Sequence, residues 1–398
     1  MSLLMVLCLV LAVAGVIENR LHLGRIRRIP IRIHVNGTRG KSTTTRLIAA
    51  GLREAGLKVI AKTTGTAARL ILEDGSEQPI SRRGLRADII EQVRTAALAR
   101  RRGADALVVE CMAIHPENQW VSEHRMVRAT IGVLTNARDD HLDVMGPTIH
   151  DAAAALALTV PAHAHLVTTR GEGLTAIMRR AAAIGTTVHV VDGSSVPDDV
   201  NEGFAYVSFK DNVACALKAC QLAGVDSKVA IRGMLRAAGD PGVTQVIHCV
   251  VHGARCVLVN AFAANDPSST AMLWARFSES LHGRRMPVIA VMNNRSDRPQ
   301  RIVGLADVVA RDLKPDHVVL IGQLGRLARR ELARAGLDPA RVVDLTGGAH
   351  DLRSVLDRLE ALVSGETVIF ALGNTKGMGQ ALVNHFADQP GRIEGAVS

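Results

Sequence analysis

The stretch that decides the fold is Ile31-Arg-Ile-His-Val-Asn36-Gly37-Thr38-Arg39-Gly40-Lys41-Ser42-Thr43. An apolar strand pattern runs into a loop with two glycines, and a helical pattern follows from Ser42 to Ala55. Glycines let backbone N–H groups close on phosphate oxygens, and the helix N-terminus adds a partial positive charge. Lys41 would reach the outer phosphates of a nucleotide, and Ser42 would ligate Mg²⁺. The common pattern GxxxxGK[ST] needs glycine where this chain has Val35, so the sequence predicts a shortened phosphate-binding loop, GxxGK[ST].

Two groups of acidic residues follow predicted strands further along the chain. The apolar run Ala106-Leu-Val-Val ends in Glu110, and the next strand ends in Thr135-Asn136, ahead of Asp139-Asp140-His141-Leu-Asp143. The carboxyl ends of parallel strands meet at one edge of a sheet, so we expect Glu110 beside the loop, where a carboxylate can hold Mg²⁺. A solvated strand end is the alternative for Glu110. For His141, metal binding and a structural role both stay open.

Short β-rich runs alternate with helical patterns from Ile31 onward, which is typical of parallel α/β architecture. The predicted strands are Ile31 to Asn36, Lys58 to Ala61, Ala106 to Glu110, Thr130 to Asn136, His165 to Thr168, Thr187 to Val191, Arg255 to Asn260, Val288 to Asn293, His317 to Ile321 and Thr367 to Leu372. The predicted helices include Ser42 to Ala55, Ala87 to Arg102 and Thr148 to Thr159. A turn-rich break at Gly239-Asp-Pro-Gly242 separates two series. We therefore expect a nucleotide-binding domain over residues 20–245 and a smaller α/β domain over 246–398.

The first residues predict a transmembrane anchor over 1–19. Ser2 to Ile17 carry no charge, and the arginines that follow at once are Arg20, Arg25, Arg27, Arg28 and Arg32. Sixteen helical residues span ~24 Å, which approaches the ~30 Å hydrocarbon core when flanking residues are added. A cleaved signal peptide, with Ala12-Val-Ala14 as its cleavage site, and a buried core helix are the alternatives. Because the positive charge follows the apolar run, the positive-inside rule places the rest of the chain in the cytoplasm.

The charge balance suggests a nucleic-acid partner, but the aromatic count argues against one. The chain has 398 residues, with 48 Lys+Arg against 38 Asp+Glu, and a formal net charge of +10. Only 6 Phe, 2 Trp and 1 Tyr are available to stack on unpaired bases, and no nucleic-acid-binding module is recognisable. Apolar residues make up 47% and charged residues 22% of the chain, which excludes wholesale disorder.

The 6 cysteines form no CxxC pair and no regular framework, as expected in a reducing compartment. One local cluster, His248, Cys249, His252 and Cys256, has zinc-ligand chemistry. In a strand, however, His248 and His252 would point to one face and Cys249 to the other. We therefore expect a strand and a turn with ordinary buried thiols.

Taken together, these motifs resemble the Mur ligase superfamily of ATP-dependent amide-bond-forming enzymes. The resemblance is carried by Gly37-Thr-Arg-Gly-Lys-Ser-Thr43, by Glu110, and by Asn136 followed by Asp140-His-Leu-Asp143. It narrows to the poly-γ-glutamate synthase ligase subunits at Lys62-Thr-Thr-Gly-Thr66, Glu110-Cys-Met-Ala113 and Asp140-His-Leu-Asp-Val-Met-Gly-Pro147. It implies an α/β fold with a P-loop Mur-ligase-like central domain built on a parallel sheet. A smaller C-terminal α/β ligase domain and one N-terminal transmembrane helix complete the expected architecture.

The resemblance also implies roles for individual residues. The expected nucleotide-binding residues are Asn36, Gly37, Thr38, Arg39, Gly40, Lys41, Ser42, Thr43, Asn265 and Asp297. Asn265-Asp-Pro-Ser268 resembles a segment near the nucleotide ribose, and Asn293-Asn-Arg-Ser-Asp297-Arg298 resembles an element that closes over the phosphates. Ser42, Glu110 and His141 would hold the metal ion. The catalytic residues would be Lys41, Glu110, His141 and Arg298, and a surface arginine is the alternative for Arg298.

The function implied is polymerisation of glutamate into poly-γ-glutamate, a capsule polymer, with ATP and Mg²⁺ as cofactors and Mn²⁺ as an alternative ion. A substrate carboxylate would attack the γ-phosphoryl group, and the amine of glutamate would attack the resulting acyl phosphate. The implied partners are the growing chain, the cell membrane and small integral membrane subunits of the PgsC/CapC and PgsA/CapA kinds, and a homo-oligomer is compatible. Another Mur-type amino-acid ligase and a membrane-tethered ATPase switch are the alternative functions.

Overall fold

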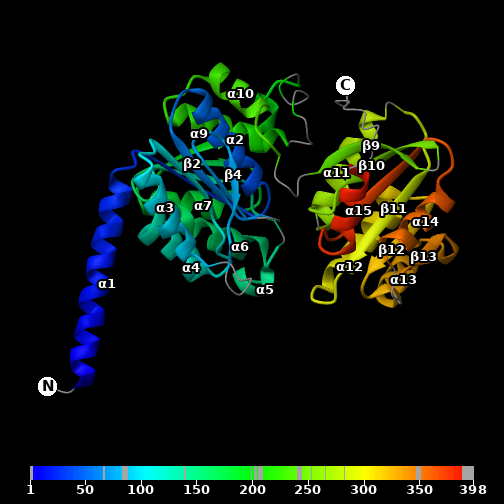
Figure 1. The fold of residues 1–398 in the computed structure, drawn as a ribbon, viewed down its shortest axis with the longest axis horizontal. Coiled ribbons are helices and arrows are strands. Elements are labelled where there is room, and N and C mark those ends of the chain that lie inside the picture. Colours follow the sequence, from blue (N-terminus) through cyan, green and yellow to red (C-terminus); the bar gives the residue numbers. More distant parts are fainter. Residues whose placement is uncertain are drawn as a thin grey trace. The chain divides into compact units, whose positions relative to one another are not determined.

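The computed structural model describes two compact units (Figure 1). The described residues are 3–65, 68–82, 88–138, 140–198, 200, 204, 209–239, 244–251, 253–264, 266–281, 283–346 and 351–387. Unit 1 comprises Met1–Gly203 and Ser208–Asp240, and unit 2 comprises Phe204–Val207 and Pro241–Ser398.

Unit 1 is built on an eight-stranded sheet in the order β4-β3-β2-β5-β1-β6-β7-β8. Its strands are β1 (Ile31–Asn36), β2 (Val59–Thr63), β3 (Arg69–Ile71), β4 (Glu77–Pro79), β5 (Ala106–Glu110), β6 (Ile131–Leu134), β7 (His165–Thr169) and β8 (Thr187–Val191). The neighbouring strands β2, β5, β1, β6, β7 and β8 pair in parallel. At the β2 edge of the sheet, β3 and β4 form an antiparallel hairpin. The predicted α/β class is confirmed, while the β3–β4 hairpin is an addition that the sequence pattern does not predict.

The helices of unit 1 cover both faces of this sheet. They are α1 (Leu3–Arg27), α2 (Lys41–Glu54), α3 (Ile90–Arg101), α4 (Pro116–Val121), the π-helical turn η1 (Ser122–Val127), α5 (Leu142–Met145), α6 (Ile149–Leu156), η2 (Ala157–Thr159), α7 (Leu174–Ala183), η3 (Gly193–Ser195), α9 (Lys210–Leu222) and α10 (Ser227–Leu235). Helices α2, α9 and α10 pack together, and α1 packs against α3 (Figure 1).

The strand order predicts where this sheet would bind a ligand. After β1 the chain passes through α2 to β2 on one side, and after β6 it passes through α5 and α6 to β7 on the other. Neighbouring strands whose connections diverge leave a crevice outside their carboxyl ends, which is where open α/β sheets bind ligands. The predicted phosphate loop follows β1 and therefore lies at this point of the sheet.

Helix α1 is long and apolar enough to cross a membrane, judged by length and composition. Its apolar window has a mean hydropathy of 2.0 and none of it is buried in the protein. Near the other end of the same helix, His22 and Ile26 are buried within unit 1.

Unit 2 contains a six-stranded sheet in the order β13-β12-β11-β14-β10-β9. Its elements are β9 (Gln245–Val251), β10 (Ala254–Asn260), α11 (Pro267–Ser280), β11 (Val288–Asn294), α12 (Gln300–Val308), the π-helical turn η4 (Val309–Leu313), β12 (His317–Gly322), α13 (Gly325–Arg334), η5 (Pro339–Arg341), β13 (Val342–Asp344), α14 (Leu352–Leu362), β14 (Thr367–Leu372) and α15 (Met378–Ala387). Among the described strands of this second sheet, only β9 runs antiparallel to its neighbour, and it pairs Cys249 opposite Cys256 on β10. Both cysteines are free and buried, as predicted, whereas His252 lies outside the described residues.

Candidate active site

Two glycines shape the loop between β1 and α2. Gly37 and Gly40 have φ angles of +131° and +82°, in the region that favours glycine. A Cβ on Gly37 would lie 2.2 Å from Thr135 Oγ1, and one on Gly40 would lie 2.3 Å from Asn212 Oδ1. Both positions therefore exclude a larger residue on steric as well as conformational grounds. Because α2 begins at Lys41, its first backbone N–H groups are open to a phosphate at the loop.

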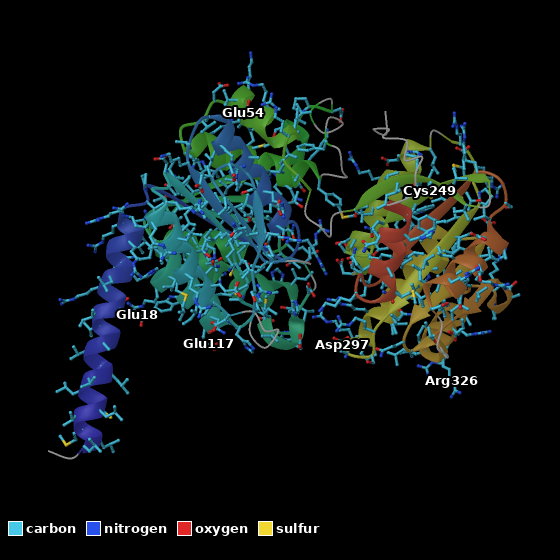
Figure 2. All side chains as sticks on the ribbon, viewed as in Figure 1. Glu18, Glu54, Glu117, Cys249, Asp297 and Arg326 are labelled. Carbon is cyan, nitrogen blue, oxygen red and sulfur yellow. The ribbon has the colours of Figure 1, made fainter. Side chains whose placement is uncertain are left out.

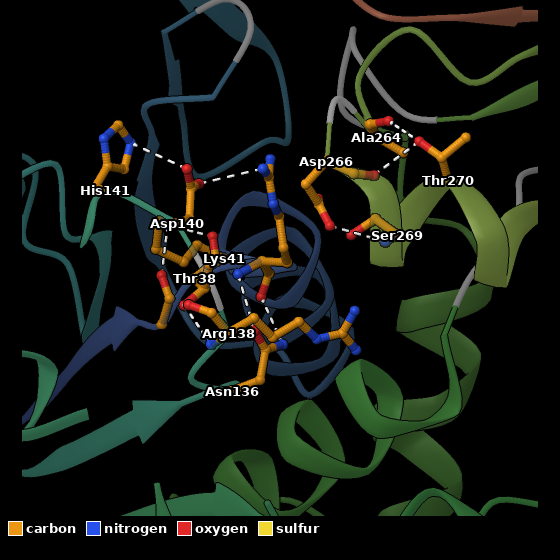
Figure 3. Close-up of polar contacts among 12 residues, drawn as sticks. Thr38, Lys41, Asn136, Arg138, Asp140, His141, Ala264, Asp266, Ser269 and Thr270 are labelled. Atoms are coloured by element: carbon orange, nitrogen blue, oxygen red, sulfur yellow. Dashed lines mark hydrogen bonds and ion pairs between the residues drawn. The ribbon is translucent and has the colours of Figure 1, made fainter. Parts of the chain in front are cut away.

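The carboxyl end of β6 holds the loop in place (Figure 3). The Thr38 N–H donates to the Asn136 carbonyl at 2.9 Å. The Asn136 amide group accepts from the Arg39 N–H at 3.0 Å and donates to the Arg39 carbonyl at 3.1 Å. The Thr135 hydroxyl donates to the same carbonyl at 2.6 Å, and the Arg138 N–H donates to Thr38 Oγ1 at 3.0 Å. The backbone of the loop is thus preorganised before any ligand binds.

The Lys41 side chain folds back over the loop (Figure 3). Its Nζ donates to the Gly37 carbonyl at 2.6 Å and to the Thr38 carbonyl at 3.1 Å. Burial lowers the pKa of the Lys41 ammonium, and the nearby charge of Glu110 opposes this shift. A phosphate bound in the loop would offer this cation a charged acceptor in place of the carbonyls.

A carboxylate and a hydroxyl meet beside the loop. Ser42 Oγ donates to Glu110 Oε2 at 2.8 Å, and the Thr64 N–H donates to the same oxygen at 2.6 Å. Glu110 is 2% exposed and ends β5. These oxygen donors suit Mg²⁺, which commonly takes one or two carboxylates and completes its shell with phosphates and water. The described residues hold no cluster of three or more His, Cys, Asp or Glu side chains, so an ion here would need nucleotide oxygens as further ligands.

His141 lies beside Asp140, and Asp140 in turn contacts Arg39 of the loop (Figure 3). Its Nε2 lies 3.9 Å from Asp140 Oδ1, and Asp140 Oδ2 lies 3.2 Å from a terminal nitrogen of Arg39. His141 has a φ of +54° and precedes α5. The structure therefore joins Ser42 and Glu110 directly, and it places His141 beside Asp140. Asp139 lies outside the described residues.

The Asn36 side chain is buried next to the loop, where it binds two other side chains of unit 1. It is 2% exposed, and its Nδ2 donates to Gln119 Oε1 at 2.9 Å and to Thr159 Oγ1 at 3.1 Å. Any contact between Asn36 and a nucleotide would thus come from its backbone. Thr43 lies half-buried in the first turn of α2.

Three functional neighbours of the loop are not predicted from the sequence. The first is Thr64, whose N–H binds Glu110. The other two are Gln119, which binds Asn36, and Asn212, which faces Gly40. Thr64 belongs to the conspicuous run Lys62-Thr-Thr-Gly-Thr66, which was a usable signal. Gln119 and Asn212 come from helices far along the chain, and nothing in their local sequence marks them.

Unit 2 has a crevice of its own, between the ends of β11 and β14. Asn294, at the end of β11, is 4% exposed, and its Nδ2 has no hydrogen-bond partner among the described residues. A Cβ on Gly373, just after β14, would lie 2.4 Å from the Asn293 carbonyl oxygen. Arg298 and Asn294 line the same small hollow as Gly373. The close approach of the two strand ends and the unpaired amide suit a small polar ligand.

The remaining predicted residues of unit 2 have separate surroundings. Asp297 forms a two-point ion pair with Arg295, at 2.9 Å and 2.7 Å, so its carboxylate is already engaged. Asn265 lies outside the described residues. Its neighbour Asp266 caps α11 by accepting from the Ser269 N–H at 2.9 Å (Figure 3).

Two family models match most of the chain. Residues 35–229 match the Mur ligase middle domain, and residues 246–389 match the poly-gamma-glutamate synthase CapB C-terminal domain. The PGA synthase CapB of Bacillus subtilis (strain 168) is 36% identical over 384 residues, which cover 96% of this chain and 97% of that protein. The capsule biosynthesis protein CapB of Bacillus anthracis is 35% identical over 380 residues, covering 95% of this chain and 81% of that protein.

Solved structures show the same fold at lower identity. E. coli FolC in complex with ADP has a TM-score of 0.68 at 19% identity, covering 93% of this chain and 92% of that one. MurF from Acinetobacter baumannii has a TM-score of 0.66 at 13% identity, covering 94% of this chain and 80% of that one. Both likenesses agree with the α/β fold described above.

Proposed function

This chain belongs to the poly-γ-glutamate synthase CapB family of Mur-type, ATP-dependent amide ligases, and we propose that it polymerises glutamate into poly-γ-glutamate through an acyl-phosphate intermediate. The observation that carries the proposal is the meeting of Lys41, Ser42 and Glu110 at one edge of the parallel sheet. Phosphoryl transfer needs mainly positioning and charge neutralisation, and these three side chains supply both.

The loop binds the triphosphate of ATP. Backbone N–H groups at the start of α2 and the Lys41 ammonium neutralise phosphate oxygens. Ser42 and Glu110 would hold Mg²⁺ or Mn²⁺, which would neutralise the remaining phosphate charge, and His141 would be a further ligand. Arg39, oriented by Asp140 at 3.2 Å, adds a cation at the mouth of the loop.

The reaction has two steps. A carboxylate oxygen of the substrate attacks the γ-phosphorus, the bond to the bridging oxygen breaks, and ADP leaves. The amine of a glutamate then attacks the acyl carbon, loses a proton, and expels inorganic phosphate to give a γ-amide. Arg298, Asp297 and Asn265 of unit 2 are proposed to contact the nucleotide, with Arg298 neutralising charge on the transferred phosphate. Exclusion of water would protect the acyl phosphate from hydrolysis.

We place the reaction at the cytoplasmic face of the cell membrane. The apolar run of α1 suits a single transmembrane span, and the arginines that follow it favour the cytoplasm for both units. A synthase that passes a polyanion outward needs membrane partners, so small integral membrane subunits are proposed to work with this chain.

The test compares two lysine variants in membranes that contain the full complex. Lys41→Ala removes the loop cation, whereas Lys58→Ala removes an exposed lysine just before β2. We expect Lys41→Ala to lower glutamate-dependent ATP turnover about 100-fold or more, as for other groups that stabilise transition-state charge. Lys58→Ala should leave turnover unchanged. With hydroxylamine added, the unaltered protein should yield glutamyl hydroxamate, the trapped form of an acyl phosphate.

Two results would contradict the proposal. Glutamate-dependent turnover that survives Lys41→Ala would remove the loop from the reaction. ATP hydrolysis that yields neither high-mass polymer nor hydroxamate would favour the ATPase switch.

A further inference from the structure

Helix α1 enters unit 1 without a linker. Its apolar run ends at Ile17, and five residues later in the same helix His22 Nε2 donates to the Met126 carbonyl at 2.7 Å. Ile26 is 2% exposed and belongs to a hydrophobic cluster that includes Val127. The second half of α1 is therefore part of the core of unit 1, and the first half projects from it.

Arg32 on β1 fastens this junction. Its guanidinium donates to the Ile29 carbonyl at 2.6 Å, to the Ile26 carbonyl at 3.4 Å and to the Arg128 carbonyl at 2.9 Å. These bonds tie the end of α1 and the end of η1 to the same strand. These contacts fix the position and the orientation of unit 1 relative to α1, so no flexible linker separates them.

The height of η1 follows from helix geometry. Five residues from Ile17 to His22 rise about 7.5 Å, and the headgroup layer outside the hydrocarbon core is about 5 to 8 Å thick. With α1 spanning the bilayer as proposed, the Met126 carbonyl, which contacts His22, would lie at the level of the lipid headgroups. In Figure 2 the labelled Glu117 on α4 lies near the level of the labelled Glu18, the first charged residue after the apolar run.

The residues on α4 and η1 suit that level. Trp120 is partly exposed, and the Arg125 guanidinium lies over its ring, 5.4 Å from the centroid. Arg125 and Arg128 are exposed, while Glu117 is the exposed acid of this segment. Tryptophan is enriched at membrane interfaces, and arginine is attracted by anionic headgroups.

We propose that α4 and η1, residues Pro116–Val127, form a second membrane contact, the interfacial segment, in which Trp120 and Arg125 lie among anionic lipid headgroups. The inference rests on the membrane location of α1 given under Proposed function. Continuity with α1 and the two exposed arginines, Arg125 in the segment and Arg128 just after it, favour lipid over a protein partner as the occupant.

The contact would orient the active site. The interfacial segment follows β5 by five residues, so it starts at the carboxyl edge of the sheet, where the phosphate loop lies, and runs toward the start of β6 at the opposite edge. Within the segment, Gln119 accepts from Asn36 at 2.9 Å and Glu123 lies 2.8 Å from His34, and both partners belong to β1. The strand that carries the loop is thereby bonded to the lipid-facing segment, and the polymer would be released beside the bilayer.

The two tryptophans of the chain allow a direct test on the full-length protein. Trp274→Phe leaves Trp120 as the single tryptophan, and Trp120→Phe leaves Trp274, which lies on α11 of unit 2. Each variant is reconstituted into vesicles of phosphatidylcholine and phosphatidylglycerol that carry a spin label on the headgroup. We expect the label to quench Trp120 fluorescence at least twofold, and the Trp120→Phe protein measures the quenching of Trp274 as the reference. In vesicles without phosphatidylglycerol, the quenching of Trp120 should weaken.

Charge reversal supplies a second measurement. Arg125→Glu in the Trp274→Phe background should reduce the quenching at least twofold, whereas Arg329→Glu, at an exposed arginine of unit 2, should not. Vesicle flotation of the same samples separates the two premises. Protein that floats while Trp120 stays unquenched overturns the interfacial segment alone, and protein that fails to float overturns the membrane location on which it rests.

Discussion

At the scale of single residues, a buried ion pair lies beneath the phosphate loop. His34 Nδ1 and Glu123 Oε2 are 2.8 Å apart, with side-chain exposures of 0% and 1%. Burial lowers the pKa of His34, but its contacts with Cys111 and Glu123 outweigh that effect and raise the pKa to about 9. Glu123 also accepts from the Ala129 N–H at 2.8 Å, so the carboxylate is held on both oxygens. The charge on His34 therefore persists at neutral pH.

Because of this pair, the folding stability should decrease as the pH rises into the alkaline range. An unfolded histidine has a pKa of about 6.5, so between that value and about 9 the folded state binds more protons than the unfolded state. The contribution of the pair is fully present below about pH 6.5 and is lost as the pH rises through about 9. We predict that Tm falls between pH 7 and 9.5 more steeply in the unaltered protein than in His34→Gln/Glu123→Gln, measured by scanning calorimetry. Parallel curves for the two proteins would contradict this account.

The residues proposed to face the nucleotide are easier to predict from local sequence than the residues that support them. Gly37, Gly40, Lys41 and Ser42 form a contiguous pattern whose chemistry can be read without a structure, and Glu110 is placed by the end of its strand. The role of the Asn36 side chain depends on Gln119, which is 83 residues away along the chain. Such a contact is a property of packing, so no local pattern predicts it.

At the scale of elements, α1 has two halves with different surroundings. Residues before Arg20 make few contacts with the rest of unit 1, whereas His22, Ile26 and Ile29 are buried in it. Removal of residues 1–19 should therefore leave the core intact, while removal of residues 1–27 should expose part of it.

We predict a clear contrast between these two truncations. The protein lacking residues 1–19 should leave the membrane fraction, retain its Tm and synthesise less polymer. The protein lacking residues 1–27 should lose about 2 to 4 kcal/mol of unfolding free energy, from the burial of Ile26 and the hydrogen bond of His22. Urea unfolding of both proteins measures the difference. Equal stability of the two truncations would show that the second half of α1 does not belong to the core.

Long, strongly patterned elements are predicted well, and short ones are not. The strands β1, β5, β8 and β14 have the predicted bounds, and α2 begins one residue before the predicted helix. The strands β3 and β4 have three residues each, too few for a hydrophobic alternation to appear. Their position depends on contacts such as the ion pair between Glu77 and the buried Arg46.

At the scale of the whole molecule, the net charge of +10 has several local uses. Arg39 and Lys41 lie at the phosphate loop, Arg125 and Arg128 belong to or border the interfacial segment, and Arg32 is engaged inside unit 1. Arg32 is thus not a free flanking charge of the anchor, although the sequence groups it with Arg20 to Arg28. A total charge carries no information about such assignments, because it does not distinguish surface arginines from structural ones.

The two units have separate sheets and separate hydrophobic cores, and this predicts separate unfolding. The main boundary between the two units lies after Asp240. It is close to the turn-rich break in the sequence and a few residues before the predicted domain boundary at 245. Calorimetry of the full chain should therefore resolve two transitions. Phe370→Ala, at a residue with 0% exposure in unit 2, should lower one of them, because such cavities cost about 3 to 5 kcal/mol.

The other transition should report on the nucleotide. A ligand at 100 times its Kd stabilises the unit that binds it by about 2.7 kcal/mol, so Mg²⁺ with ADP should raise the transition that Phe370→Ala leaves in place. Lys41→Ala should abolish that rise, and Lys58→Ala should preserve it. A single transition, or a Phe370→Ala effect on both, would mean that the units fold as one body. If the nucleotide raised the transition of unit 2 more than that of unit 1, the main nucleotide-binding site would not be the loop at residues 37–43.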